Sequence, residues 1–182
     1  MFIDKRPLGI FCRSESQKVT MDLNNEELLE ISLKLERDGK RFYTELAKTV
    51  QDRVLKDFFK LMAREEAQHE KQFKNLLDSK KGKKLGWENN STLRNFMDRE
   101  FQTDIFPSPK ETLKELPSLG GISKALDIAI ESERIAGEFF QLLNASCNDI
   151  DIKTLLTMLE KLEAEHLEKV LSLKKRFLND NN

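Results

Sequence analysis

The chain has 182 residues, enough for one domain with a sizeable core but short for two independent ones. Charged residues make up 35% of it, whereas Gly and Pro number only 7 and 4, a balance typical of long solvated helices, so we expect an all-α fold. Acidic and basic residues nearly cancel, at 32 against 31, which argues against nucleic acid or an anionic membrane surface as a partner.

Residues 1–22 are expected to form an N-terminal arm, and residues 23–182 a single helical domain. The arm lacks an apolar run long enough for a signal peptide, and no stretch of the chain has the length of a membrane span. Cys12 and Cys147 lie far apart and form no CxxC pair, which excludes a Cys-rich zinc or iron site built by this chain alone. These features predict a reduced, cytoplasmic protein.

Four long segments place apolar residues at steps of three or four, the spacing of a helix with one buried face. The first segment spans about 25 to 50 and the third about 123 to 147. The inner face of the second contains Leu55, Phe59, Met62, Glu66, His69, Phe73 and Leu76, and that of the fourth contains Ile152, Leu156, Leu159, Glu163, His166, Val170 and Leu173. Both of these faces carry a Glu and a His among their hydrophobic residues.

The second half of the chain resembles the first at an offset of 97 residues. The pairs at this offset include Leu29 with Leu126, Glu36 with Glu133, Phe42 with Phe139, Glu66 with Glu163, and His69 with His166. An internal repeat of a helical hairpin explains the match, with hairpin 1 at about 24–79 and hairpin 2 at about 123–178.

Capping residues predict where the helices begin. Asp52 and its counterpart Asp149 stand where the second helix of each hairpin should start, with a side chain that can accept from open amides of the first turn. Asn24 with Glu27 resembles a capping box for the first helix. Ser123, preceded by an apolar residue, is predicted to cap the third helix.

Residues 80–122 connect the hairpins and contain three of the four prolines. Residues 91–101 are expected to form a brief amphipathic helix, and Ser108 with Pro109 the start of another. A connection of this length lets the second hairpin cross over and run the opposite way. The sequence therefore predicts an antiparallel four-helix bundle made of two repeated hairpins with one long crossover.

The chain contains only two histidines, and each follows a glutamate by three residues, so that both side chains of a pair share one helix face. Glu36 and Glu66 both lie 15 residues from a turn centred near residue 51, or roughly 22 Å along antiparallel helices, so they should meet at one level. The same argument, with a turn centred near residue 148, brings Glu133 level with Glu163. The predicted metal ligands are Glu36, Glu66, His69, Glu133, Glu163 and His166.

Electrostatics supports this prediction. Four carboxylates in an apolar core would each cost several kcal/mol if left ionised and unpaired, and two divalent ions cancel four negative charges. Oxygen ligands with one imidazole per ion suit iron and manganese and tolerate zinc, so we expect two iron ions. A single Glu-x-x-His pair would most often lie on a solvated surface, but two pairs in register with two further core glutamates favour a metal site.

Other residues near the six have two interpretations each. Tyr43, the candidate catalytic residue, could donate to a ligand carboxylate or to bound oxygen, but a core aromatic with a satisfied hydroxyl is favoured; its repeat partner is Phe140. Gly39 and Gly137 lie one turn beyond Glu36 and Glu133, where close approach of the first and third helices or loose packing would explain them. By periodicity, solvent rather than metal is expected for Glu65, Glu70, Glu131, Glu138 and Glu165.

Four motifs carry a family resemblance: LKLERDGKRFY, EEAQH, IAIESERIAGEFF and EAEH. Over about 24–178 they resemble the rubrerythrin-like branch of the ferritin-like superfamily, which implies a ferritin-like bundle and the six ligands above. Rubrerythrins proper carry a rubredoxin module with four cysteines that this chain lacks. The family's additional glutamate, one turn before the third-helix ligand, is Ile130 here, which weakens the case for peroxide reduction of the rubrerythrin type.

Three functions remain open from the sequence. The first is an oxidoreductase, active under oxidative stress, that reduces peroxide or dioxygen at a Glu4His2 di-iron centre with electrons from a separate donor protein. The second is a non-catalytic metal-binding or iron-handling protein. The third is a metal-free helical interaction module, which would have to explain six polar core residues in register. The resemblance also implies a homodimer.

Overall fold

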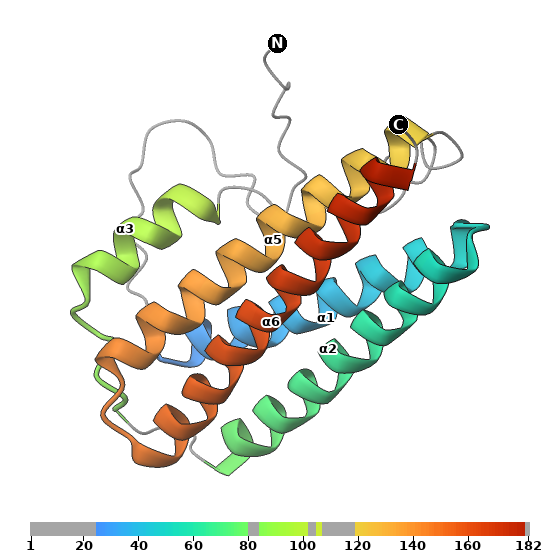
Figure 1. Ribbon diagram of the computed structural model, residues 1–182. Helices are drawn as coiled ribbons and strands as arrows, with labels where there is room; N and C mark the ends of the chain where they lie inside the picture. The colour runs from blue at the N-terminus through green and yellow to red at the C-terminus, as the bar shows by residue number, and fades with distance from the viewer. Residues whose placement is uncertain (1–24, 80–83, 102–104, 107–118, 181–182) are drawn as a thin grey trace, which may run out of the picture.

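The computed structural model describes residues 25–79, 84–101, 105–106 and 119–180 (Figure 1). The helices in these ranges are α1 (Asn25–Thr49), α2 (Arg53–Ser79), α3 (Ser91–Glu100), α5 (Leu119–Ser146) and α6 (Ile150–Asp180). The expected all-α fold is confirmed. Among the described helices, none has an apolar stretch long enough to cross a bilayer. The proposed arm at 1–22 lies outside the described residues.

The two predicted hairpins are present, with α1 packed along α2 and α5 packed along α6. In Figure 1, α5 starts at the end of the bundle where α2 starts, and α6 returns to that same end. Because α2 and α5 therefore run in the same direction, the chain must cross the length of the bundle between them. The antiparallel four-helix bundle with one long crossover is confirmed.

Both predicted aspartate caps are in place. Asp52 Oδ1 accepts a hydrogen bond of 2.9 Å from the amide of Leu55, in the first turn of α2. Asp149 Oδ1 accepts one of 3.2 Å from the amide of Ile152, in the first turn of α6. Each bond satisfies an amide that has no partner within its own helix. The predicted cap at Asn24 lies outside the described residues.

The predicted start of the third long helix is wrong. α5 begins at Leu119, so Ser123 lies inside the helix instead of capping it. The extra turn includes glycine, which lowers helix propensity by up to about 1 kcal/mol per residue. Packing outweighs this cost, since Gly121 is buried and Ile122 packs against apolar residues of the core.

The short helix predicted at 91–101 is present as α3, which packs on the outer side of α5. The ring of Phe96 in α3 stacks on the ring of Phe139 in α5, with centroids 6.5 Å apart. Asn90 caps α3 by accepting from the amide of Leu93 at 3.0 Å. The second predicted start, at Ser108, lies outside the described residues.

A glycine turn fixes the beginning of the crossover to the end of α5. Gly86 has a φ of +94°, which L side chains rarely adopt. A Cβ added there would lie 2.4 Å from the carbonyl oxygen of Ser146, far inside van der Waals contact. Beside it, the buried indole of Trp87 donates a 2.9 Å hydrogen bond to the carbonyl of Leu143. Only glycine fits this turn.

Two apolar clusters fill the bundle, one toward each end. The first includes Leu28, Leu35, Phe73, Phe139, Phe140, Leu156 and Leu159, and the second includes Phe42, Leu46, Phe59, Met62, Leu126, Val170 and Leu173. Every long helix contributes to both clusters. The predicted glutamates and histidines lie at the changeover between clusters on all four helices, so a polar layer crosses the middle of the core.

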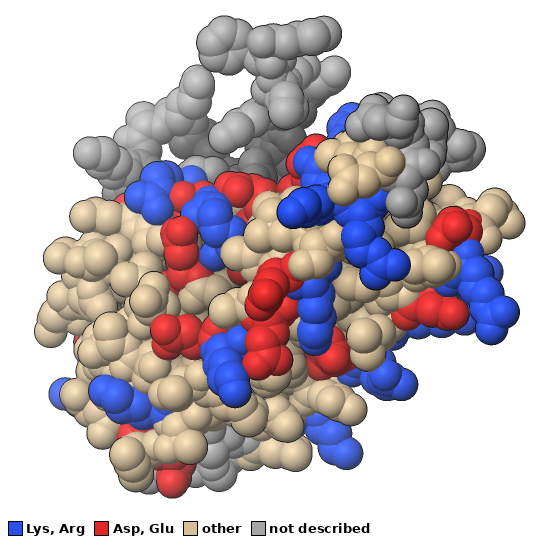
Figure 2. All heavy atoms as spheres, in the orientation of Figure 1, with Lys and Arg blue, Asp and Glu red and all other residues tan. Residues whose placement is uncertain are grey.

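The face formed by α5 and α6 carries acidic and basic side chains next to one another (Figure 2). Arg134 contacts Glu131 at 2.7 Å and Glu138 at 2.5 Å, and Lys174 of α6 is paired with Asp127 of α5. Exposed pairs of this kind contribute about 0–1 kcal/mol each. The fold therefore depends on the apolar clusters and on how the polar layer between them is neutralised.

Candidate metal centre

All six predicted ligands lie in the polar layer, and none is more than 3% exposed. Glu36 comes from α1, Glu133 from α5, and the two Glu-x-x-His pairs from α2 and α6. The turn of the first hairpin occupies residues 50–52 and that of the second 147–149, so the predicted turn centres at 51 and 148 are confirmed. Equal distance from each turn brings the glutamate of one helix level with the pair on the next.

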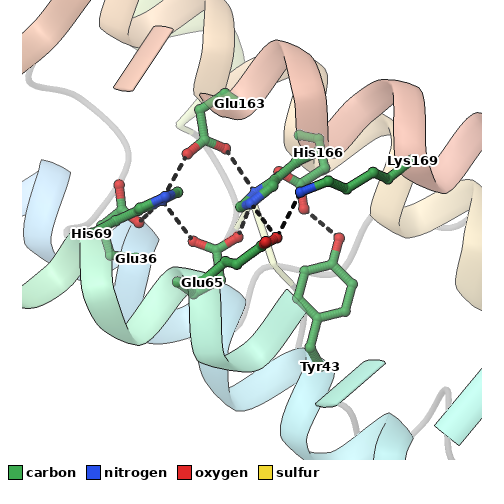
Figure 3. Close-up of polar contacts among 9 residues, drawn as sticks. Glu36, Tyr43, Glu65, His69, Glu163, His166 and Lys169 are labelled. Carbon is green, nitrogen blue, oxygen red and sulfur yellow. Dashed lines mark hydrogen bonds and ion pairs between the residues drawn. The ribbon is translucent and has the colours of Figure 1, made fainter. Parts of the chain in front are cut away.

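The six side chains form two half-sites, each arranged around the Nδ1 atom of one histidine (Figure 3). His69 Nδ1 lies 3.3 Å from Glu36 Oε2, 3.3 Å from Glu163 Oε1 and 3.7 Å from Glu66 Oε2. We call this group the His69 half-site. Three of its carboxylates therefore converge on one ring nitrogen.

The His166 half-site has the same plan. His166 Nδ1 lies 3.1 Å from Glu66 Oε1, 3.5 Å from Glu133 Oε2 and 3.8 Å from Glu163 Oε2. Glu66 and Glu163 thus present one oxygen to each half-site, while Glu133 serves only this one. The two imidazole rings stack with centroids 5.1 Å apart, so the half-sites are direct neighbours.

The donor atoms fit metal ions better than they fit one another. Eight buried nitrogen and oxygen atoms of the six residues have no hydrogen-bond partner among the described residues. Six of them, all except Glu36 Oε1 and His166 Nε2, lie within 3.1–3.5 Å of another of the six. Ligand atoms of Glu66, His69, Glu163 and His166 all lie within 4.8 Å of one another. A buried polar atom without a partner costs about 1–3 kcal/mol, and ions bound between these atoms would satisfy them together.

Burial disfavours the charged carboxylates. It raises the pKa of Glu36 from its ordinary 4.5 to about 8, and it raises the pKa values of Glu66 and Glu163 well above that ordinary value. For His166, burial acts downward, but contacts with the carboxylates of Glu133 and Glu66 outweigh it and raise the pKa to about 12. Without cations, the layer therefore retains protons that a metal ion would have to displace.

Tyr43 joins the second apolar cluster to the metal centre. Its ring is fully buried, and its hydroxyl donates a hydrogen bond to Glu133 Oε1. Both sequence interpretations thus describe the same side chain, a core aromatic whose hydroxyl meets a site carboxylate. Burial first, and then the charge of Glu133, raises the pKa of Tyr43 well above its ordinary value, so the hydroxyl keeps its proton.

Part of the crossover forms one wall of the centre. The Phe106 ring packs against Phe42 and Tyr43 of α1, with centroids 5.7 Å and 6.1 Å apart. The carbonyl of Ile105 accepts a 2.7 Å hydrogen bond from Ser132 of α5, the neighbour of Glu133. The segment 105–106 therefore contacts both first helices of the hairpins beside the polar layer.

Gly39 provides the space for this wall. A Cβ there would lie 3.2 Å from the Phe106 ring and 3.3 Å from the carboxyl carbon of Glu66. The two expectations for Gly39 were close approach of the first and third helices, or loose packing. In the structure, Phe106 of the crossover and the carboxyl group of Glu66 approach Gly39 instead. At Gly137, an added Cβ would meet only Glu163 Cβ, at an ordinary 3.6 Å.

Glu65 departs from its predicted place in solvent. Its carboxylate lies 3.2 Å from His166 Nε2, the ring nitrogen that faces away from the half-site, and accepts a 2.8 Å hydrogen bond from Lys169 (Figure 3). A break in the repeat was the available signal, because residue 162, the counterpart of Glu65, is leucine. The other four neighbouring glutamates form surface ion pairs with Arg or Lys.

Two Glu-x-x-His pairs and two further glutamates, buried in a four-helix bundle with one crossover, define the ferritin-like class of helical bundles with a carboxylate and histidine metal-binding cluster. A family model described as rubrerythrin matches residues 27–174. Because this match covers most of the sequence, the chain belongs to the rubrerythrin family. A search of curated proteins finds no match.

Two solved structures have a similar fold. A hypothetical protein from Pyrococcus furiosus is 24% identical, with a TM-score of 0.66 over 88% of this chain and 94% of that one. A protein from Thermotoga maritima, provisionally described as a ferritin-like diiron-carboxylate protein, is 23% identical, with a TM-score of 0.63 over 85% of this chain and 96% of that one. These similarities support the ferritin-like fold.

Proposed function

We propose that this protein is an oxidoreductase that reduces peroxide or dioxygen at a di-iron centre, with electrons from a separate donor protein. The observation that supports it most directly is the sharing of Glu66 and Glu163 between two half-sites, each completed by its own glutamate and histidine. Carboxylate oxygens with one imidazole per ion suit iron(II) or manganese(II) and also accept zinc. The description of the Thermotoga maritima protein as diiron-carboxylate supports iron among these.

The roles of the six residues follow from their positions. Glu36 and His69 would hold one ion, Glu133 and His166 the other, and Glu66 and Glu163 would contact both. Two bound ferrous ions would supply two electrons, which with two protons suffice to reduce peroxide to water or dioxygen to peroxide. The protein supplies the rest. Its apolar clusters exclude bulk water, and its helices hold four carboxylates in one layer, where two divalent ions would neutralise them.

Several partners belong to the same proposal. The electrons that restore the ferrous state are proposed to come from a separate donor protein. Peroxide or oxygen is proposed as the substrate, and a homodimer in the cytoplasm as the working form. Tyr43 is proposed to orient Glu133 through its hydroxyl, without a role in bond making.

An alternative is a metal-binding or iron-handling protein without turnover. It is favoured by the composition of the polar layer: among the described residues, the six donors are the only buried carboxylates and imidazoles, and Ile130 stands where rubrerythrins carry a further glutamate. All six donors would be occupied in binding the two ions, which leaves none of them free to take part in a reaction.

Single-turnover kinetics separates the two functions. The chain is loaded anaerobically with iron(II), its metal content is measured, and it is mixed in a stopped-flow instrument with peroxide or with oxygenated buffer. The enzyme proposal requires oxidation much faster than that of free iron(II), followed by re-reduction and a second turnover. Loaded iron that oxidises no faster than free iron would leave the metal-binding alternative, and failure to bind metal would overturn both.

A further inference from the structure

The two histidines differ at the ring nitrogen that faces away from the half-sites. At His166, Nε2 lies 3.2 Å from Glu65 Oε2, and the same oxygen accepts the 2.8 Å hydrogen bond from Lys169 Nζ (Figure 3). Among the described residues, no carboxylate lies within ion-pair distance of His69 Nε2; the ion pairs of His69 all involve Nδ1. The two half-sites match in their inner donors but not in this outer contact.

The sequence repeat shows that the difference is built into the chain. At the 97-residue offset, the counterpart of Glu65 is Leu162, and the counterpart of Lys169 is Gln72. The hydroxyl of Tyr43, which contacts Glu133, has no counterpart either, since that position is Phe140. Both extra polar contacts therefore support the His166 half-site.

The outer contact has a known physical effect on a histidine ligand. When Nδ1 binds a cation, the neutral ring carries its proton on Nε2, and a carboxylate placed there accepts that proton in a hydrogen bond. The hydrogen bond fixes the orientation of the ring and increases the electron density on the nitrogen that binds the metal. Loss of such a partner typically lowers metal affinity by about 10- to 100-fold.

Glu65 is well placed to act in this way. Its side chain is 26% exposed and that of Lys169 is 34% exposed, so the pair reaches the surface while the imidazole it touches is buried. Lys169 lies one turn beyond His166 on α6, whereas Glu65 comes from α2. The ion pair therefore holds the carboxylate across the gap between the two hairpins, at the height of the histidine.

We propose that Glu65, held in place by Lys169, is a positioning residue for His166, and that it makes the His166 half-site bind its metal ion more tightly than the His69 half-site. This inference rests on the proposed di-metal site but not on its activity. Metal is then expected to load in order, first between His166 and Glu133 and afterwards between His69 and Glu36.

Calorimetric titration of the metal-free chain with cobalt(II) tests the order of loading, and visible absorption reports the coordination of each ion. We expect two separate steps in the wild type. The Glu65→Leu variant, which copies the natural residue at position 162, should weaken the tighter step by about 10- to 100-fold. Glu65→Gln, which keeps an acceptor oxygen without the charge, should retain part of the affinity.

The matched control is Glu70→Leu. Like Glu65, Glu70 lies on α2 next to a predicted ligand and forms an ion pair with a lysine, Lys40, at 3.2 Å. Its side chain is 23% exposed, and it has no ion pair with a histidine among the described residues. Its loss should leave the tighter step, at the His166 half-site, unchanged. A general weakening of the bundle would affect the two glutamate variants alike.

Histidine variants assign the effect to one half-site. In a His69→Ala background only the His166 half-site remains complete, and adding Glu65→Leu should weaken it as in the wild type. In a His166→Ala background the same change should have no effect. Equal effects in both backgrounds, or two steps of wild-type affinity in Glu65→Leu, would overturn the inference while leaving the metal site intact. A wild-type chain that binds no cobalt(II), manganese(II) or iron(II) would instead overturn the proposed function.

Discussion

Glu66 and Glu163 face each other across the bundle, and each offers one carboxylate oxygen to His69 and the other to His166. Glu36 and Glu133, in contrast, each contact a single histidine. Two of the six donor residues are thus shared between the half-sites, and the other four belong to one half-site each. This difference leads to distinct expectations for each kind of substitution.

Replacing a shared glutamate should weaken the binding of both ions, whereas replacing a glutamate that belongs to one half-site should weaken the binding of one ion. We expect Glu66→Gln to lose nearly all bound metal, and Glu36→Gln to keep one ion per chain, because its partner half-site remains complete. Elemental analysis after anaerobic loading and desalting measures the content. Glu70→Gln serves as a surface control that retains full loading. Equal losses in Glu66→Gln and Glu36→Gln would contradict the shared arrangement.

The metal-free protein should lose stability as the pH rises. Glu36 has a folded pKa of about 8 against an ordinary 4.5, so between these values the folded chain binds more protons than the unfolded chain, and the free energy of unfolding falls with increasing pH. The raised pKa of His166, about 12 against 6.5, acts in the same direction above pH 6.5. Thermal unfolding of the metal-free chain from pH 5 to pH 8 measures the trend.

Metal should reverse this dependence, because ions bind the deprotonated carboxylates and are displaced by acid. The difference in Tm between the loaded and metal-free chains is therefore expected to widen from pH 5 to pH 8. Glu36→Gln, which cannot titrate, should show a shallower loss of metal-free stability. A metal-free Tm that rises over this range would show that the buried layer does not retain protons.

Tyr43→Phe should weaken the fold more than it weakens metal binding. The hydroxyl donates to Glu133, and loss of a hydrogen bond to a charged group costs about 1.5–3 kcal/mol. The aromatic ring stays, so the packing with Phe59 and Phe106 is kept. Urea denaturation measures the change. Retention of wild-type stability would mean that Glu133 finds another donor in solution.

Gly86→Ala should destabilise the chain by about 1–3 kcal/mol, because the added Cβ meets the carbonyl oxygen of Ser146 and the backbone is held at a φ of +94°. Gly137→Ala is the matched comparison. Its Cβ meets only an ordinary contact at 3.6 Å, so higher helix propensity should stabilise α5 by up to about 1 kcal/mol. Opposite signs for the two variants in denaturant unfolding would support both assignments, and equal signs would not.

Phe106→Ala should open the wall of the centre. The ring packs against Gly39 and Tyr43 beside Glu66, so its removal is expected to speed the transfer of bound metal to a chelator. Phe101→Ala is the control, since that ring packs against Phe96 and Phe139 on the far side of α5. Both variants lose aromatic packing, but only the first should change the release rate. Equal rates would show that ions leave by another route.

The sequence predicted the bundle and the polar layer because both depend on spacing along single helices. Steps of three and four placed the glutamates and histidines on apolar faces, and equal distances from the turn centres at residues 51 and 148 set their common level. The start of α5 was missed, because packing of Ile122 adds a turn that helix propensity and capping rules do not favour.

Contacts between elements were harder to predict. Periodicity placed Glu65 away from the metal-facing donors correctly, but it could not show that the outer side of His166 lies beside it. Phe106 belongs to an irregular segment, where no spacing rule gives direction, so its contact with Gly39 was not foreseen. At both positions, the contacts of a side chain depend on how separate elements pack against one another, which the spacing of residues along one helix does not determine.

The polar layer also bears on how the molecule would respond to a pull on its ends. Each hairpin supplies three of the six donors, and Glu163 of one reaches His69 of the other. Bound ions would therefore connect the two hairpins at the middle of the bundle. They would link chain segments about a hundred residues apart, much as a covalent cross-link closes a long loop. Stripped of ions, the same bundle would part along this seam first, with each hairpin keeping its own helices paired.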